Sequence, residues 1–381
     1  MADQPISGFS VLDLSMVGPG SRCTALLADL GADVIKVGAP KGRIDPPFFS
    51  YGAGRGTRRI RIDLRAPEGR DAFLRLAMGT DVIVESYRPG VADRLGVGFT
   101  DVRKVNESVV YCAITGYGQE GPYAGWAGHD LNYLGVGGFL GTQGIRDDGG
   151  PAIPGATVAD SAAGGMLAAI AILAALVRRA STGEGKFLDV STTEGVLSLM
   201  TLPIDEFLAT GKETGPGSSL LTGEYACYDV YRAGDGRWVS VAAIEPAFFA
   251  NLCRALDCEE WIPHQMDPDR QEAIREAFRS AFARRDRDEW VAELGPADTC
   301  VAPVLTIAEV AKHRHFAARG VFAEAEHPEQ GRFRQLAPVV AGVERQTEYQ
   351  AGPTGTIDQI LGEAGMTSDE IANLKSKGVV A

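Results

Sequence analysis

A histidine and an aspartate side by side give the sequence its clearest chemical signal. His129 and Asp130 lie in a stretch from Gly116 to Gly144 that glycines interrupt repeatedly. Long glycine-rich loops in compact domains usually serve a function. A histidine changes protonation near neutral pH and can act as a general acid or base. Because a lone histidine is more often structural, position alone makes His129 a candidate and no more.

Two further carboxylates lie at expected element boundaries. Asp160 comes just before an apolar helix expected over 162–179, and its simplest role is to cap that helix. The small residues that follow it would also let a ligand approach, so both roles stay open. Glu245 ends an expected strand just before Pro246, where capping or solvent exposure is the default interpretation. Sequence distance cannot place Glu245 beside His129.

Arginines gather in two short segments. Arg58, Arg59 and Arg61 crowd one of them, and Arg88 and Arg94 flank a Pro-Gly turn in the other. Such clusters at the carboxyl ends of parallel strands can bind phosphates through charge-assisted hydrogen bonds. Solvated salt bridges explain them equally well, so phosphate binding remains a hypothesis at this point.

The turn Gly18-Pro19-Gly20 is a weaker signal. It separates an expected strand from an expected helix, where backbone N–H groups could bind a phosphate. It lacks the G-x-G-x-x-G pattern, however, and Pro19 has no N–H to donate. The turn is therefore better interpreted as a tight connection.

Several other kinds of site are not supported by the sequence. The remaining histidines form no H-x-x-x-H or H-E-x-x-H motif, and neither a G-x-S-x-G motif nor a P-loop is present. No metal site is therefore expected. The net charge of −13, from 37 basic and 50 acidic residues, argues against binding to nucleic acid or to a membrane surface.

Composition indicates a soluble globular chain, and its length allows two domains or one large domain with a smaller insertion. The chain has 381 residues, 45% of them hydrophobic and 23% charged. Its six cysteines show no C-x-x-C spacing, and residues 1–7 show no secretory signal, so a cytoplasmic protein with reduced thiols is expected. The apolar stretch over 162–177 is rich in alanine and glycine and favours a buried helix over a membrane span.

Short apolar runs alternate with helical patterns through the first half, which predicts an α/β fold with a parallel sheet. The expected strands are 11–14, 33–37, 60–64, 81–85, 109–115 and 186–190, and the expected helices are 23–30, 68–78, 162–179 and 194–209. A large domain over 1–210 follows from this pattern. Residues 211–224 are rich in Gly, Pro and Ser and are expected to be a linker. A smaller α+β domain over 225–325 and a C-terminal segment over 326–381 complete the expected organisation.

Read together, these motifs resemble the family III CoA-transferases, of the CaiB/BaiF type, and within them the α-methylacyl-CoA racemase branch. The resemblance covers nearly the whole chain. It rests on several segments in the right order: LLADLGADVIKV, ESYRPGVADRLGVG, TGYGQEGP, AGHDLNYL, VADSAAGGMLAAIAILAAL and VAAIEPAFF.

The resemblance implies a Rossmann-like large domain joined by long linkers to the smaller domain, in an interlocked homodimer. The C-terminal segment would return to the large domain. An acyl-CoA would bind in the large domain, with the small domain of the other subunit covering the acyl end. Lys36, Arg88 and Arg94 match positions that hold the CoA phosphates, and Arg59 is a weaker match.

The resemblance also implies a reaction. His129 and Asp160 match the two acid/bases of the racemases, Glu245 the carboxylate paired with the histidine, and Asp130 a neighbouring supporting residue. The enolate oxygen would be stabilised by backbone N–H groups just after Asp160. No metal or redox cofactor would be required. In the CoA-transferases the aspartate matching Asp160 is instead a nucleophile, and the histidine is not needed. The AGHDLNYL segment favours the racemase, while the acyl group stays unidentified.

Overall fold

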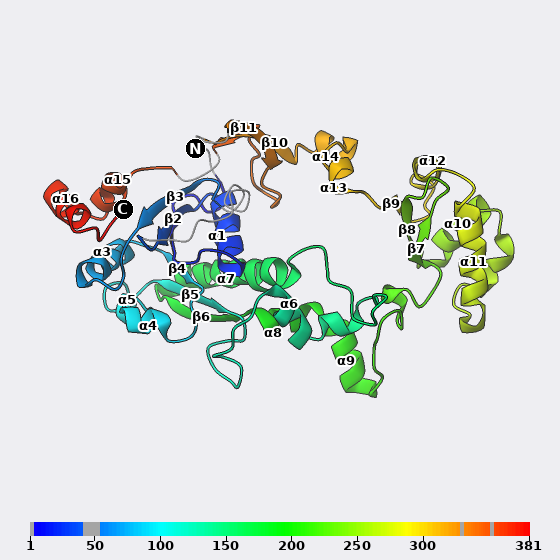
Figure 1. Ribbon diagram of the computed structural model, residues 1–381, viewed down its shortest axis with the longest axis horizontal. Coiled ribbons are helices and arrows are strands. Elements are labelled where there is room, and N and C mark those ends of the chain that lie inside the picture. The colour runs from blue at the N-terminus through cyan, green and yellow to red at the C-terminus, as the bar shows by residue number, and fades with distance from the viewer. Residues whose placement is uncertain (1–3, 41–53, 328–330, 351–353) are drawn as a thin grey trace. The chain divides into compact units, whose positions relative to one another are not determined.

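The computed structural model describes residues 4–40, 54–327, 331–350 and 354–381 (Figure 1). The chain divides into two compact units. Unit 1 comprises Met1–Gly138, Pro154–Thr201 and Arg314–Ala381, and unit 2 comprises Phe139–Ile153 and Leu202–His313. Unit 2 thus includes the segment 211–224 that the composition marks as a linker, together with the end of the glycine-rich stretch.

Unit 1 is built on a six-stranded sheet in which every strand pair is parallel. The spatial order is β3-β2-β1-β4-β5-β6, and the strands are β1 (Ser10–Asp13), β2 (Asp33–Gly38), β3 (Thr57–Arg61), β4 (Val82–Glu85), β5 (Val110–Thr115) and β6 (Lys186–Ser191). The predicted α/β class with a parallel sheet is confirmed. Buried apolar residues line both faces because successive strand residues point to opposite sides.

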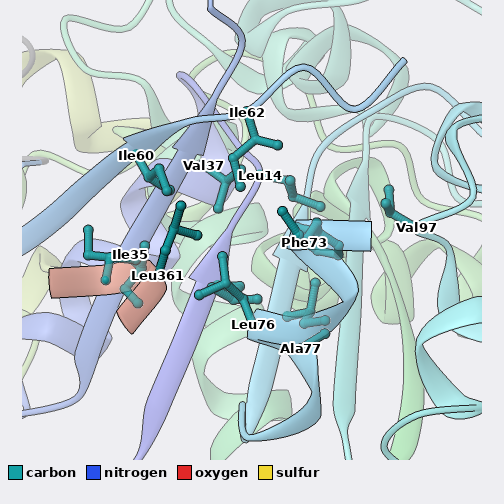
Figure 2. Packing of buried hydrophobic residues seen from close by; sticks show 14 of the residues in the cluster. Leu14, Ile35, Val37, Ile60, Ile62, Phe73, Leu76, Ala77, Val97 and Leu361 are labelled. Atoms are coloured by element: carbon teal, nitrogen blue, oxygen red, sulfur yellow. The ribbon is translucent and has the colours of Figure 1, made fainter. Parts of the chain in front are cut away.

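Helices cover both faces of this sheet. Helices α1 (Pro19–Asp29) and α7 (Leu167–Thr182) pack on one face, through Cys23, Leu27 and Ile172 among others. The other face carries α3 (Pro67–Met78), α4 (Val91–Leu95) and α5 (Phe99–Arg103). Figure 2 shows part of this second core, where Phe73 and Leu76 of α3 lie against the strands.

The strand order creates a crevice at the carboxyl ends of the two central strands, β1 and β4. The chain runs outward from β1 through β2 to β3. Helix α3 then connects β3 to β4, which lies on the other side of β1. The connections that leave the carboxyl ends of β1 and β4 therefore depart in opposite directions. In open parallel sheets this is where ligands bind.

Two segments differ from the expected pattern. The stretch 116–144 is not a continuous loop, since it contains α6 (Asp130–Val136) and a 3₁₀ turn (Phe139–Thr142). The helix expected over 194–209 is two helices, α8 (Thr192–Leu199) and α9 (Thr201–Thr210). Pro203 explains the break, because it has no N–H for the carbonyl of Leu199 and its ring clashes with that carbonyl in a continuous helix.

The C-terminal part of unit 1 begins at Arg314, so it contains residues 314–325, which were expected in the small domain, as well as the expected C-terminal segment over 326–381. A small sheet is formed by β10 (Phe322–His327), β11 (Gly331–Leu336) and β12 (Glu348–Gln350), preceded by α14 (Arg314–Ala318). Helices α15 (Ile357–Glu363) and α16 (Ser368–Ser376) then place four side chains in the core under α3. Leu361 is one of them (Figure 2). The last residue, Ala381, exchanges two backbone hydrogen bonds with Arg61.

Unit 2 combines an antiparallel sheet with helices. Its sheet has the order β7-β8-β9, formed by β7 (Tyr228–Arg232), β8 (Trp238–Ala242) and β9 (Val301–Pro303). The helices are α10 (Pro246–Ala255), α11 (Gln271–Phe282), α12 (Arg287–Leu294) and α13 (Ile307–Val310), together with all of α9 except Thr201. The 3₁₀ turns are Phe139–Thr142, Leu220–Thr222, Glu259–His264 and Pro268–Arg270. Buried aromatic side chains of α10, α11 and α12 pack on the sheet.

Among the described residues, the continuous helix Ala159–Thr182 is long and apolar enough to cross a membrane by length and composition. A core helix of a soluble protein passes the same test. In this structure Ala168, Ile172 and Leu176 of the helix are buried against the sheet of unit 1.

Candidate active site

A cleft of about 550 Å³ opens at the crevice between β1 and β4. Its walls come from the turn after β1, the turn after β4, the end of β5 and the segment that leads into α6. His129, Asp160 and Arg88 all line it. The cleft therefore brings together the two predicted acid/bases and one predicted phosphate-binding residue, all within unit 1.

His129 is the N-cap residue of α6. Its backbone N–H donates to Oδ1 of Asn132 at 3.0 Å, and its carbonyl oxygen accepts from the N–H of Asn132 at 2.8 Å. These bonds satisfy the backbone at the start of the helix. The residue is exposed at the cleft wall, so its imidazole can reach a ligand there.

Asp130 ties the histidine segment to Asp160. Its Oδ1 accepts a hydrogen bond from the backbone N–H of Asp160 at 2.8 Å. Because Asp130 follows His129 directly, this bond fixes the start of α6 against the segment that carries Asp160. The supporting role expected of Asp130 is compatible with this contact and stays a prediction.

The environment of Asp160 favours its protonated form. Burial, and then the nearby charge of Asp130, raise the pKa of Asp160 to about 6, against the opposing influence of His129 and Arg22. A carboxyl group with such a pKa exchanges a proton readily near neutral pH. Perturbed carboxyl groups in clefts are typical of functional sites.

Asp160 does not cap a helix. It lies in the first turn of a π-helix, η2 (Ala159–Met166), which continues into α7, and the N-cap residue is Val158. The capping interpretation is therefore wrong. The N–H of Asp160 donates to Asp130, and the N–H of Ser161 donates to the carbonyl oxygen of Thr157 at 2.9 Å. These two N–H groups already have acceptors, which argues against their use for an enolate oxygen.

Close backbone packing surrounds Asp160. Gly18, with a φ of 73°, lies in the turn after β1, and a Cβ atom there would stand 3.4 Å from Oδ2 of Asp160. Glycine is favoured at such a φ. A Cβ on Gly195 of α8 would stand 2.1 Å from the carbonyl oxygen of Ala163, so only glycine allows α8 to approach the π-helix this closely.

The predicted phosphate-binding residues do not gather in one place. Arg88 lines the cleft, and Arg94 is exposed on the short helix α4 that follows it. Arg59 lines a different cavity, of about 480 Å³, together with Arg61 and Lys375. Only Arg88 therefore shares a cavity with the two acid/bases.

Lys36 does not line the cleft and belongs to a buried polar cluster. Its Nζ donates to Oδ2 of Asp13 at 2.6 Å, and hydroxyl oxygens of Ser21 and Thr24 lie 3.3 Å away. Lys36 is 7% exposed and Asp13 is fully buried. The three ammonium protons thus have partners inside the protein. A phosphate that binds Lys36 would have to displace these partners, so the arrangement does not favour phosphate binding. Phosphate binding by Lys36 stays a prediction.

Glu245 belongs to unit 2, where it is the exposed N-cap residue of α10. Its side chain makes no capping hydrogen bond. Burial first, and then the charges of Glu245 and Asp298, raise the pKa of the Cys300 thiol. The pairing of Glu245 with His129 remains a prediction.

Sequence reasoning missed several residues of the cleft. Tyr133 lines it, and its hydroxyl donates to the carbonyl oxygen of Gly128 at 2.6 Å. Trp126 forms part of the wall and is 55% exposed. Thr115 is 8% exposed, and among the described residues its hydroxyl has no hydrogen-bond partner. Irregular spacing of these residues left no periodic signal to find them by.

Within the described parts of the chain, no group of three or more His, Cys, Asp or Glu side chains could hold a metal ion. Besides neutral polar side chains, the cleft contains the two predicted acid/bases, His129 and Asp160, and an arginine, Arg88. This donor set suits proton transfer and the binding of an anionic ligand.

Comparison with known proteins adds to this geometry. A family model described as CoA-transferase family III matches residues 6–356. The chain belongs to this family. Family III CoA-transferases include both racemases and CoA-transferases, and the chain is similar to members of each kind.

The α-methylacyl-CoA racemase of Homo sapiens is 33% identical over 98% of this chain and 97% of its own length. The succinyl-CoA:glutarate CoA-transferase of Homo sapiens is 29% identical over 88% of this chain and 80% of its own. Among solved structures, a CaiB/BaiF family protein from Brucella suis has a TM-score of 0.81 and 27% identity, covering 95% of this chain and all of its own. These likenesses establish the family and leave the two activities to be distinguished.

Proposed function

We propose that the protein is a racemase of 2-methyl-branched, or similarly 2-substituted, acyl-CoA thioesters. One observation carries the proposal: His129 and Asp160 line the same cleft. Inversion of the carbon next to a thioester requires one group to remove its proton and another to return a proton on the opposite face. The transfer of CoA between carboxylic acids requires the aspartate alone.

The proposed reaction moves one proton at each face. In one direction, the Asp160 carboxylate accepts the α-proton, and the C–H electron pair passes into an enolate whose charge rests on the thioester oxygen. Protonated His129 then donates a proton to the same carbon from the other face. The reverse direction exchanges the two roles. A pKa of about 6 leaves Asp160 mainly ionised at pH 7 yet basic enough to accept a proton.

The proposal assigns stabilisation of the enolate to a helix N-terminus rather than to the N–H groups just after Asp160. The N–H groups of Asp160 and Ser161 already have acceptors. Gly18 and Pro19, at the start of the eleven-residue helix α1, line the same cleft. The positive end of this helix would therefore favour negative charge on the thioester oxygen.

The remaining parts of the proposal concern binding and assembly. Arg88 and the neighbouring Arg94 would hold phosphates of the CoA moiety. In an interlocked homodimer, Glu245 of one subunit would orient His129 of the other subunit. The α-proton of a thioester is acidic enough for acid/base residues to remove it, so no metal or redox cofactor would be required. A cytoplasmic location fits a pool of acyl-CoA substrates.

A second candidate function is CoA transfer. The Asp160 carboxylate would attack the thioester carbonyl, release CoA as a thiolate and form a mixed anhydride. The thiolate would then attack the aspartyl carbonyl, giving an enzyme thioester and the free acid. Likeness to the succinyl-CoA:glutarate and succinyl-CoA:mesaconate CoA-transferases supports this alternative.

The two functions differ in a single experiment. The purified protein is incubated in D₂O with a 2-methylacyl-CoA of one configuration, with and without a carboxylic acid acceptor, and the α-position is followed by NMR and mass spectrometry. Racemase activity predicts deuterium at the α-carbon and loss of configuration without acceptor, and the loss of configuration should be abolished in His129→Ala and in Asp160→Asn. CoA on the acceptor without α-exchange, retained in His129→Ala, would refute the racemase proposal.

A further inference from the structure

Four aromatic rings form a continuous ladder, and two of them, Trp126 and Tyr133, line the cleft. Tyr123 and Trp126 are stacked, with ring centroids 3.8 Å apart and planes inclined by 16°. Tyr117 meets both rings edge-on, at 5.7 Å from Tyr123 and 6.3 Å from Trp126. Tyr117 also meets Tyr133 edge-on at 5.3 Å. Stacked and edge-to-face pairs at these separations are attractive, so each ring restrains the next.

The ladder is anchored at its buried end. Tyr133 is 9% exposed, and its hydroxyl donates to the carbonyl oxygen of Gly128. A Cβ atom on Gly116 or Gly128 would stand 2.3 or 2.6 Å from Cε1 of Tyr133, so the backbone closes on this ring from two sides. Trp126 is 55% exposed at the other end. A rigid support therefore holds a large aromatic ring at the cleft wall.

The position of Trp126 along the chain limits what it can contact. It lies three residues before His129, and three residues span at most roughly 10 Å of chain. The α-carbon of a thioester that reacts with His129 must lie next to the imidazole. In CoA, the adenine is separated from the thioester by the whole pantetheine and diphosphate arm. Trp126 therefore lies closer to the acyl group than an extended CoA would place its adenine.

We propose that Trp126 is a specificity-determining residue, whose indole binds the acyl group of the thioester and selects a flat apolar substituent, such as an aromatic ring, at the α-carbon. The proposal rests on the proposed function, since it takes the α-carbon to lie at His129. A flat substituent gains more from an indole face than a short alkyl chain does, because it can stack as well as bury apolar surface. The aromatic ladder keeps the indole in place before the substrate arrives, which limits the entropy lost on binding.

The test measures binding rather than turnover. Non-reactive thioether analogues of 2-phenylpropanoyl-CoA and 2-methylbutanoyl-CoA, and CoA itself, are titrated calorimetrically into the full-length protein and its Trp126→Ala and Trp126→Phe variants. Trp126→Ala should weaken binding of the phenyl analogue about tenfold or more and that of the other two ligands less than threefold. Trp126→Phe should retain most of the affinity. The matched control is Trp238→Ala, at a 45% exposed tryptophan of unit 2, which should leave all three affinities unchanged.

Two results would overturn the inference. Equal loss of affinity for CoA and for both analogues would mean that Trp126 contacts the CoA moiety. Unchanged affinities in a folded Trp126→Ala protein would mean that the ladder only supports the segment before α6. Thermal unfolding of each variant separates these results from misfolding. If the wild-type protein prefers the phenyl analogue but shows no α-proton exchange, the racemase proposal fails while the role of Trp126 in binding stands.

Discussion

Replacement of Asp160 by asparagine is expected to stabilise the fold near neutral pH while it abolishes inversion of the α-carbon. Burial and the charge of Asp130 raise the pKa of Asp160 to about 6 in the folded protein. In the unfolded chain the group has an ordinary aspartate pKa of about 3.9. The folded state therefore binds the proton more tightly, and its stability falls as the pH rises from about 4 to about 6.

The size of this effect follows from the shift. About two pKa units, at 1.36 kcal/mol each, correspond to ~3 kcal/mol as an upper value. Asp160 is only partly buried, and solvent screening reduces the expected gain to ~1–2 kcal/mol. Asparagine cannot ionise and retains the backbone N–H that donates to Asp130. The variant should thus escape the loss of stability without losing the contact.

The assay is urea unfolding of the wild type and of Asp160→Asn at pH 4 and at pH 7.5. The difference in the free energy of unfolding should be small at pH 4, where Asp160 of the wild type is largely protonated in the folded protein and about half protonated in the unfolded chain, and should favour the variant at pH 7.5. Asp205→Asn, at an exposed carboxylate of α9, is the control and should change stability by less than about 0.5 kcal/mol at either pH. A variant that is no more stable than the wild type at pH 7.5 would refute the reasoning.

Three further predictions concern neighbouring residues. Asp130→Asn keeps an oxygen for the N–H of Asp160 but removes the like charge, so the pKa of Asp160 should fall; carboxyl ¹³C NMR that shows no downward shift would contradict this. Tyr133→Phe loses the hydrogen bond to Gly128. The kcat of α-proton exchange should fall about tenfold while KM changes less than twofold, and an unaltered kcat would exclude a positioning role for Tyr133. Gly195→Ala should cost about 2 kcal/mol or more in urea unfolding, because its Cβ would overlap a carbonyl oxygen of the π-helix, and full stability would show that α8 can move away.

The sheet of unit 1 could be predicted because its strands are buried on both faces and appear as short apolar runs between helical patterns. The expected strand 33–37 is observed as Asp33–Gly38, and 186–190 as Lys186–Ser191. The strand expected at 60–64 is observed earlier, at Thr57–Arg61. This strand contains three arginines, so it does not appear as an apolar run in the sequence. Arg58, one of the three, forms ion pairs with Asp33 and Glu363.

Short-range geometry at the site could not be predicted in the same way. Helix α6 has only seven residues and ends in a glycine-rich segment, so its period is too short to stand out. The π-helical turn at Asp160 runs directly into the α-helix that follows it, and no turn residue or proline separates the two in the sequence. The ion pair of Lys36 could be predicted once the register of the sheet is known. Asp13 and Lys36 are opposite each other in the parallel pair β1–β2, and their side chains form an ion pair.

The relation between the two acid/bases depends mainly on Asp130. His129 and Asp160 are carried by different segments, and the hydrogen bond from the N–H of Asp160 to Asp130 joins those segments at the cleft. The same carboxylate also helps to raise the pKa of Asp160. One side chain thus influences both where the second base lies and how tightly it holds a proton. A two-base inversion needs both properties at once, whereas a nucleophilic aspartate gains nothing from a fixed distance to a histidine. The arrangement around Asp130 is therefore one that the proposed racemase would use and that CoA transfer would not need.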